Sequence, residues 1–173
     1  MKSITLKMQS GMTLVELAAV LVIGLVILGV VLSNMQGVFS SAGVSEEMTN
    51  INTLYTNIRA LKTSSGYGTS GTSLVSTLYA AKGIPTSMNY VSNTLYNSFG
   101  GTVAIQSTGN GFTIEYGNVP RAECVKLVTK LSKSGIFQST KVGSASAVAG
   151  EYTPAQAGND CQDTNSITWT SAT

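Results

Sequence analysis

Histidine is missing from this 173-residue chain, and charged side chains make up only 10% of it. Without histidine, a Ser-His-Asp triad, a Cys-His nucleophile and a His-ligated zinc site are all excluded. The two cysteines, Cys124 and Cys161, are too far apart in the sequence for a metal-binding pair of the usual short spacing. No cluster of Lys and Arg forms a basic patch, so nucleic acid is not expected as the main partner. We therefore expect no catalytic residue, cofactor or metal site, and no enzyme.

The longest apolar stretch lies close to the amino terminus. Every residue in 17–32 is Ala, Val, Leu, Ile or Gly, and the apolar stretch extends back to Met12 with Glu16 as its single charge. A helix over 12–32 measures about 31 Å, the thickness of the hydrocarbon core of a bilayer. Its aliphatic side chains favour insertion by roughly 4–7 kcal/mol, against a cost of about 3 kcal/mol for the carboxylate. Because a charge retained at such a cost usually has a function, Glu16 is a candidate functional residue.

Charges on either side of this stretch indicate its orientation. Lys2 and Lys7 precede it, and the first charges after it are Glu46 and Glu47. The positive-inside rule then keeps the amino terminus in the cytoplasm and places the rest across the membrane, where a disulfide can form. A cleaved secretory signal peptide is disfavoured, because the stretch is too long and no small-residue cleavage site follows Leu32. A plain signal anchor remains an alternative.

The string Gly11-Met12-Thr13-Leu14-Val15-Glu16, behind a short basic leader, resembles the processing signal of type IV pilins. A mature chain that starts with Met resembles the type IVb branch, which includes the bundle-forming pilins, although its leaders are often longer. The resemblance implies that a prepilin peptidase cuts between Gly11 and Met12 and methylates the new amino terminus at Met12. It also implies that Glu16, the fifth residue of the mature chain, is the assembly glutamate of the family.

Hydrophobic periodicity predicts a helix that continues well beyond the apolar stretch. One stripe of residues at helical spacing consists of Met48, Ile51, Tyr55, Ile58 and Lys62. The segment Thr63-Ser64-Ser65-Gly66 follows this stripe and is expected to end the helix. A single helix over 12–62 would be about 75 Å long. The first half of this helix is apolar on every side, whereas the second half is apolar on one face only. The first half therefore needs a membrane or filament core, and the second half a globular domain.

The remaining elements are predicted from periodicity and turn residues. A short helix is expected at 74–79, a β-hairpin from strands 102–105 and 112–116, a helix from Pro120 to Lys133, a short helix capped by Thr153-Pro154, and a strand at 167–170. Residues 141–148 show no clear pattern. Asn97-Ser98-Phe99-Gly100-Gly101, before the hairpin, is similar to the segment that leads into the sheet of bundle-forming pilins. In the helix after Pro120, the apolar face carries Cys124, Leu127, Val128 and Leu131.

These elements and the resemblance together predict an α+β pilin fold, with a long amino-terminal helix on an antiparallel sheet. The expected organisation is a cleaved leader at 1–11, a transmembrane or filament-core helix at 12–37, and an amphipathic half-helix plus globular domain at 38–173, with a variable loop at 63–98 and the sheet and D-region at 99–173. In pilins a disulfide bounds the D-region, which implies a Cys124–Cys161 bridge. The alternative is two unpaired buried thiols.

The resemblance implies the major structural subunit of a type IVb pilus, which serves adhesion, aggregation or conjugation. Its partners would be other copies of itself, the prepilin peptidase and the inner-membrane assembly machinery. The precursor would lie in the inner membrane, with its leader cytoplasmic and its globular domain periplasmic, before it joins an extracellular filament. In the filament Glu16 could neutralise the Met12 ammonium of a neighbouring subunit or of its own helix. The alternatives are a minor or tip pilin, a type II secretion pseudopilin and, in another class, a single-span membrane-anchored binding module.

Overall fold

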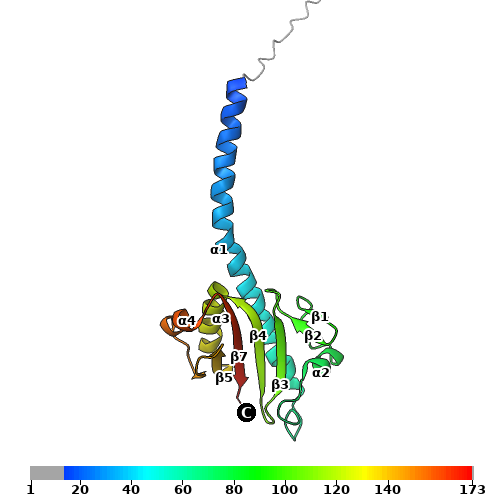
Figure 1. Ribbon diagram of the computed structural model, residues 1–173. Helices are drawn as coiled ribbons and strands as arrows, with labels where there is room; N and C mark the ends of the chain where they lie inside the picture. Colours follow the sequence, from blue (N-terminus) through cyan, green and yellow to red (C-terminus); the bar gives the residue numbers. More distant parts are fainter. Residues whose placement is uncertain (1–13, 173) are drawn as a thin grey trace, which may run out of the picture. The chain divides into compact units, whose positions relative to one another are not determined.

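The computed structural model describes residues 14–172, apart from the side chains of residues 14–16, 19 and 24–42. The chain divides into two units, Met1–Phe39 and Ser40–Thr173, each of which is considered by itself. Helix α1 (Leu14–Ala60) contributes to both units. It is followed by three shorter helices and seven strands in an α+β fold, as the sequence predicts (Figure 1).

In the first unit, the described side chains of α1 include five large apolar residues that are 51–61% exposed: Leu17, Val20, Leu21, Val22 and Ile23. Consecutive residues of an α-helix point in directions about 100° apart, so residues 20–23 present apolar side chains on every side of the helix. No helix in the described part of the chain is both long enough and apolar enough to cross a membrane.

The second unit is built on one antiparallel sheet with the strand order β1-β2-β3-β4-β7-β5-β6. Its strands are β1 (Asn89–Val91), β2 (Thr94–Tyr96), β3 (Thr102–Ser107), β4 (Phe112–Pro120), β5 (Phe137–Val142), β6 (Val148–Ala149) and β7 (Thr164–Ser171). The last strand, β7, lies between β4 and β5, so the carboxy-terminal segment holds the two halves of the sheet together.

The predicted hairpin is present as β3 and β4. Alternate residues of both strands are buried, including Ile105 and Ile114, which lie opposite each other in the register. The turn between them is closed by a 2.9 Å hydrogen bond from the Thr108 N–H to the Gly111 carbonyl. Gly109 adopts a φ of 90°, a conformation that only glycine reaches without strain.

The amphipathic part of α1 covers the sheet. Ile51, Leu54 and Ile58 are fully buried, and the Tyr55 ring lies 5.6 Å from that of Phe112 on β4. The helix ends at Ala60, two residues before the predicted end. The last turn tightens there, because the next two N–H groups bond to carbonyls three residues back rather than four.

Helix α3 (Arg121–Lys133) buries the predicted apolar face, including Cys124, Leu127, Val128 and Leu131. Pro120 is the last residue of β4 and the N-cap of α3, with an extended ψ of 157°. The prediction that Pro120 is the first helical residue was therefore wrong by one position. Helix α4 (Pro154–Asp160) is capped by Thr153, whose side chain accepts from the Gln156 N–H while the Gln156 side chain accepts from the Thr153 N–H.

Four strands were not predicted. β1 and β2 lie in the predicted variable loop, together with helix α2 (Val75–Ala80), which was predicted. β5 and β6 overlap the two ends of the region without a clear pattern, 141–148. In β5 the buried positions are Phe137, Thr140 and Val142, because a bulge between Phe137 and Ser139 breaks the alternation of two. The carboxy-terminal strand β7 is longer than the predicted 167–170.

Candidate functional site

The predicted processing and assembly residues lie at the amino terminus of the chain. Gly11 and Met12 are outside the described residues. Glu16 is in the first turn of α1, and its side chain is not among those described. Cleavage, methylation at Met12 and pairing of Glu16 therefore stay predictions. Among the described side chains, no cluster of Cys, Asp and Glu could hold a metal ion.

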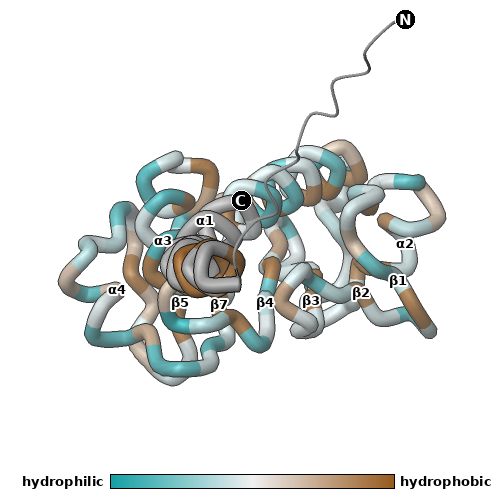
Figure 2. The backbone as a smooth tube through the Cα atoms, turned by 90° about the horizontal axis from the view of Figure 1, so that it is seen from above, coloured by the Kyte–Doolittle hydropathy of each residue, from teal (hydrophilic) through white to brown (hydrophobic). Residues whose placement is uncertain are grey.

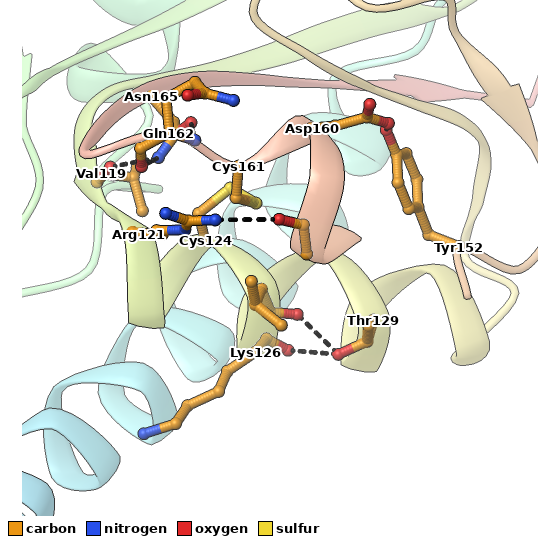
Figure 3. The surroundings of a disulfide bond; sticks show 12 residues. Val119, Arg121, Cys124, Lys126, Thr129, Tyr152, Asp160, Cys161, Gln162 and Asn165 are labelled. Atoms are coloured by element: carbon orange, nitrogen blue, oxygen red, sulfur yellow. Dashed lines mark hydrogen bonds between the residues drawn. A yellow bond between two sulfur atoms is a disulfide. The ribbon is translucent and has the colours of Figure 1, made fainter. Parts of the chain in front are cut away.

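Cys124 and Cys161 form a disulfide, with sulfur atoms 2.01 Å and Cα atoms 6.0 Å apart. This is the pairing that the pilin resemblance implies. Both residues are fully buried, and the bond joins α3 to the residue that caps the carboxy-terminal end of α4 (Figure 3). It fixes a segment that has only one short helix and the two-residue strand β6 between β5 and β7.

Polar contacts on either side of the disulfide fasten the same segment, as Figure 3 shows. The Arg121 guanidinium donates a 3.2 Å hydrogen bond to the Gly158 carbonyl. The hydroxyl of Tyr152 donates to the Asp160 carboxylate. Burial, followed by this hydrogen bond and the charge of Asp160, raises the pKa of Tyr152 well above its ordinary value. The phenol therefore stays a donor throughout the physiological pH range.

The start of β7 is held to the end of β4 by one buried amide. Asn165 donates from Nδ2 to the Val119 carbonyl at 3.0 Å, and its Oδ1 accepts from the Gln162 N–H at 2.7 Å. The amide thus adds to the main-chain pairing of Val119 with Asn165, next to the point where the β4–β7 register shifts between Tyr116 and Val119.

A buried carboxylate that sequence reasoning missed connects α1 to the sheet. Glu47 is fully buried, and its Oε1 accepts a 2.6 Å hydrogen bond from the Ser98 N–H in the loop after β2. Its Oε2 accepts a weaker one, of 3.5 Å, from the Asn50 side chain. The buried Tyr116 hydroxyl lies near this carboxylate but makes no hydrogen bond among the described residues. Burial first, and then the Glu47 carboxylate, raise the pKa of Tyr116 well above its ordinary value.

The same loop is tied to β4 by the buried side chain of Asn97. Its Oδ1 accepts from the Phe99 and Gly101 N–H groups at 3.0 and 2.9 Å, and its Nδ2 donates to the Gly117 carbonyl at 2.9 Å. A Cβ atom on Gly101 would overlap the backbone of Gly117, so only glycine permits this approach. The loop that resembles the sheet entry of bundle-forming pilins is thus fixed on both sides, by Glu47 and by Asn97.

The helical phase could have indicated the burial of Glu47. Glu47, Ile51, Leu54 and Ile58 follow spacings of four, three and four residues, which place them on one face of α1. The adjacent Glu46 is exposed. Two consecutive glutamates after an apolar stretch were interpreted only as the first charges beyond it, which hid this difference.

The fold defines the class of protein. A helix packed on an antiparallel sheet, with a disulfide-bounded carboxy-terminal region, is the arrangement of type IV pilins. The family model described as PilS N terminal matches residues 41–172, and the chain belongs to the PilS family. No curated protein matches the sequence.

A solved structure places the chain in the type IVb branch. The crystal structure of the type IVb pilin from Salmonella typhi has a TM-score of 0.62 and 25% sequence identity, over 72% of this chain and 97% of that one. The chain is therefore a type IVb pilin subunit, in a family of structural proteins rather than enzymes.

Loss of the disulfide should strongly destabilise the globular unit. We expect Cys124→Ser or Cys161→Ser to lower the free energy of unfolding by about 4 kcal/mol, because the bridge closes a loop with a sequence separation of 37. Urea unfolding of the full chain in detergent, under oxidising conditions, measures this change. Reduction of the wild type should reproduce the effect and leave both variants unchanged. A loss below about 1 kcal/mol would contradict the assignment of the bridge as a main stabilising element.

The two adjacent glutamates of α1 form a matched pair for testing the buried carboxylate. Glu47→Ala should lower the free energy of unfolding by about 2 kcal/mol or more, because the hydrogen bond from the Ser98 N–H to a buried, charged acceptor is lost. Glu46→Ala, the same change at an exposed position, should stay within about 0.5 kcal/mol of the wild type. Denaturant unfolding of both variants measures the difference. Equal effects of the two substitutions would show that Glu47 does not fasten the loop to α1.

Proposed function

We propose that this chain is the major structural subunit of a type IVb pilus. In this proposal the prepilin peptidase cuts between Gly11 and Met12 and methylates Met12. The mature subunit then polymerises through the amino-terminal part of α1 into an extracellular filament that serves adhesion, aggregation or conjugation. The globular unit, which begins near Ser40, forms the outside of that filament.

The observation that carries the proposal is the apolar surface of α1 in the first unit. Leu17, Val20, Leu21, Val22 and Ile23 are each more than half exposed, and they leave no polar side of the helix for water. A helix that is apolar all round needs an apolar environment on every side. A bilayer supplies that environment to a single subunit, and a bundle of identical helices supplies it to a filament.

Glu16 has a physical reason to lie in such a helix. Removal of residues 1–11 leaves an ammonium group on Met12, and an unpaired charge is costly to bury among apolar side chains. A carboxylate four residues further along, on a neighbouring subunit, neutralises that charge when the two subunits have the correct axial stagger. A subunit out of register leaves two unpaired charges in the core, so the pair selects the register as well as contributing attraction.

The membrane steps follow from the charges around α1. Before cleavage the leader with Lys2 and Lys7 is cytoplasmic, and residues 12–37 anchor the precursor in the inner membrane. The globular unit is periplasmic, the compartment in which the Cys124–Cys161 bond forms. The assembly machinery of the inner membrane then transfers the subunit to the filament.

Three other functions are compatible with parts of the chain. A minor or tip pilin would share every feature described, and the abundance of the subunit in filaments separates it from a major pilin. A type II secretion pseudopilin shares the amino-terminal motif but generally lacks a D-region bounded by two cysteines. A single-span anchored binding module would require neither cleavage after Gly11 nor the carboxylate of Glu16.

The role of Glu16 distinguishes assembly from simple anchoring. We expect Glu16→Ala subunits to be inserted in the membrane, because removal of the charge lowers the cost of insertion by up to about 3 kcal/mol. They should nevertheless fail to form filaments, because the Met12 ammonium has no partner in the filament core. The measurement is an immunoblot of the sheared-filament fraction against the membrane fraction.

Glu46→Ala serves as the control, because it removes an exposed carboxylate of the same helix from the globular unit. It should leave the ratio of filament to membrane subunit unchanged. Abundant filaments formed by the Glu16→Ala subunit alone would contradict the assembly role. An anchored binding module predicts that result, since it does not need the charge.

A further inference from the structure

A cavity of about 520 Å³ opens at one end of the sheet, between α2, the loop that follows it and β1. Figures 1 and 2 show α2 and β1 next to each other at this end, with α4 at the opposite end. The cavity is in the size range of small-molecule sites. Its wall includes Tyr79, Lys82, Ile84, Pro85, Met88 and Tyr90. No residue that lines it is acidic, and Lys82 is its one charged residue.

Hydrogen bonds to α1 hold the loop wall of this cavity in place. Asn57 donates from Nδ2 to the Gly83 carbonyl at 2.8 Å, and the Ser87 hydroxyl donates to Asn50 Oδ1 at 2.6 Å. A Cβ atom on Gly83 would approach Leu78 to 2.7 Å, so the loop lies as close to α2 as glycine allows. The wall between these two anchors is therefore formed before any ligand binds.

The way in which α2 ends places Lys82 at the cavity. The Lys82 N–H bonds to the Tyr79 carbonyl, and the Gly83 N–H to the Leu78 carbonyl at 2.8 Å, which is a Schellman motif. Lys82 has a φ of 54°, at a position where glycine is the usual residue. A lysine at this position costs conformational free energy that a glycine would not, and it adds a cation to the rim of the cavity.

Two aromatic rings also line the cavity. Tyr79 and Tyr90 are stacked, with ring centroids 4.1 Å apart, and the Tyr90 hydroxyl is fixed by a 2.7 Å hydrogen bond to Asn93. Tyr79 is nevertheless 56% exposed, so the outer part of the pair is open to solvent. Aromatic faces carry partial negative charge and attract the C–H groups of a ring that stacks on them.

We propose that this cavity binds an acidic sugar, a pyranose ring that carries a carboxylate, as part of a glycan outside the cell. The C–H face of the ring stacks on Tyr79, and the carboxylate pairs with the Lys82 ammonium. A ring with one apolar face, polar edges and a negative charge matches an aromatic wall next to a single cation. The inference rests on the proposed function for its extracellular setting, and it adds a ligand class to the unspecified adhesion.

The test uses the full-length protein in a zwitterionic detergent without a sugar headgroup, so it requires no filament. Titration calorimetry with sialyllactose, and with lactose as its neutral counterpart, measures both affinities. We expect Tyr79→Ala to weaken sialyllactose binding about tenfold, whereas Tyr79→Phe retains the stacking and the affinity. Lys82→Gln should reduce sialyllactose affinity about fivefold, because Lys82 is exposed, and should leave lactose binding unchanged. Lys133→Gln, an exposed lysine on α3, should change neither affinity.

Several outcomes would overturn the inference. These are no binding of sialyllactose by the folded wild type, equal affinity for lactose, or affinity unchanged by both Tyr79→Ala and Lys82→Gln. If Tyr79→Ala instead changes the oligomeric state in detergent and not sugar binding, the surface contacts a second copy of this chain and the sugar site is refuted. Should Tyr79→Ala fail to fold, Lys82→Gln at its exposed position carries the test. A negative result leaves filament assembly untouched, because Glu16 is tested separately.

Discussion

Helix α1 has to satisfy two environments, and the rest of the molecule depends on that constraint. In the first unit its described side chains are apolar and exposed all round the helix. In the globular unit the same helix buries only the face that carries Ile51, Leu54 and Ile58. In the proposed function a membrane, and later the identical helices of a filament, cover this apolar surface. The globular unit must therefore fold by itself around the amphipathic part.

A disulfide and buried side-chain hydrogen bonds hold the globular unit together, in addition to apolar packing. The Cys124–Cys161 bond holds the segment between β5 and β7, where regular structure is limited to α4 and the short β6. Glu47 fixes the loop before β3 to α1, and Asn97 fixes it to β4. Buried polar groups of this kind stabilise a structure only when their hydrogen bonds are made, which makes each partner important.

The sequence predicted the elements whose signals are local. Periodicity placed α1 and α3, and turn residues placed the β3–β4 hairpin, while the disulfide came from the resemblance to pilins. β5 was missed because its bulge breaks the alternation, and β1 and β2 because each has only three residues. The cavity beside Tyr79 joins α2, a loop and β1, which only the tertiary fold brings together. By contrast, the processing residues Gly11 and Met12 were predicted from the sequence alone, because the motif that identifies them is a continuous stretch of sequence.

We propose that this pilin is cut after Gly11 and assembled into filaments. Intact mass spectrometry of filaments sheared from cells that express the chain tests it most directly. We expect this chain to be the main filament protein, beginning at Met12, with its mass raised by one methyl group. Surface protein that still begins at Met1, or filaments without this chain as their main component, would contradict this processing and assembly.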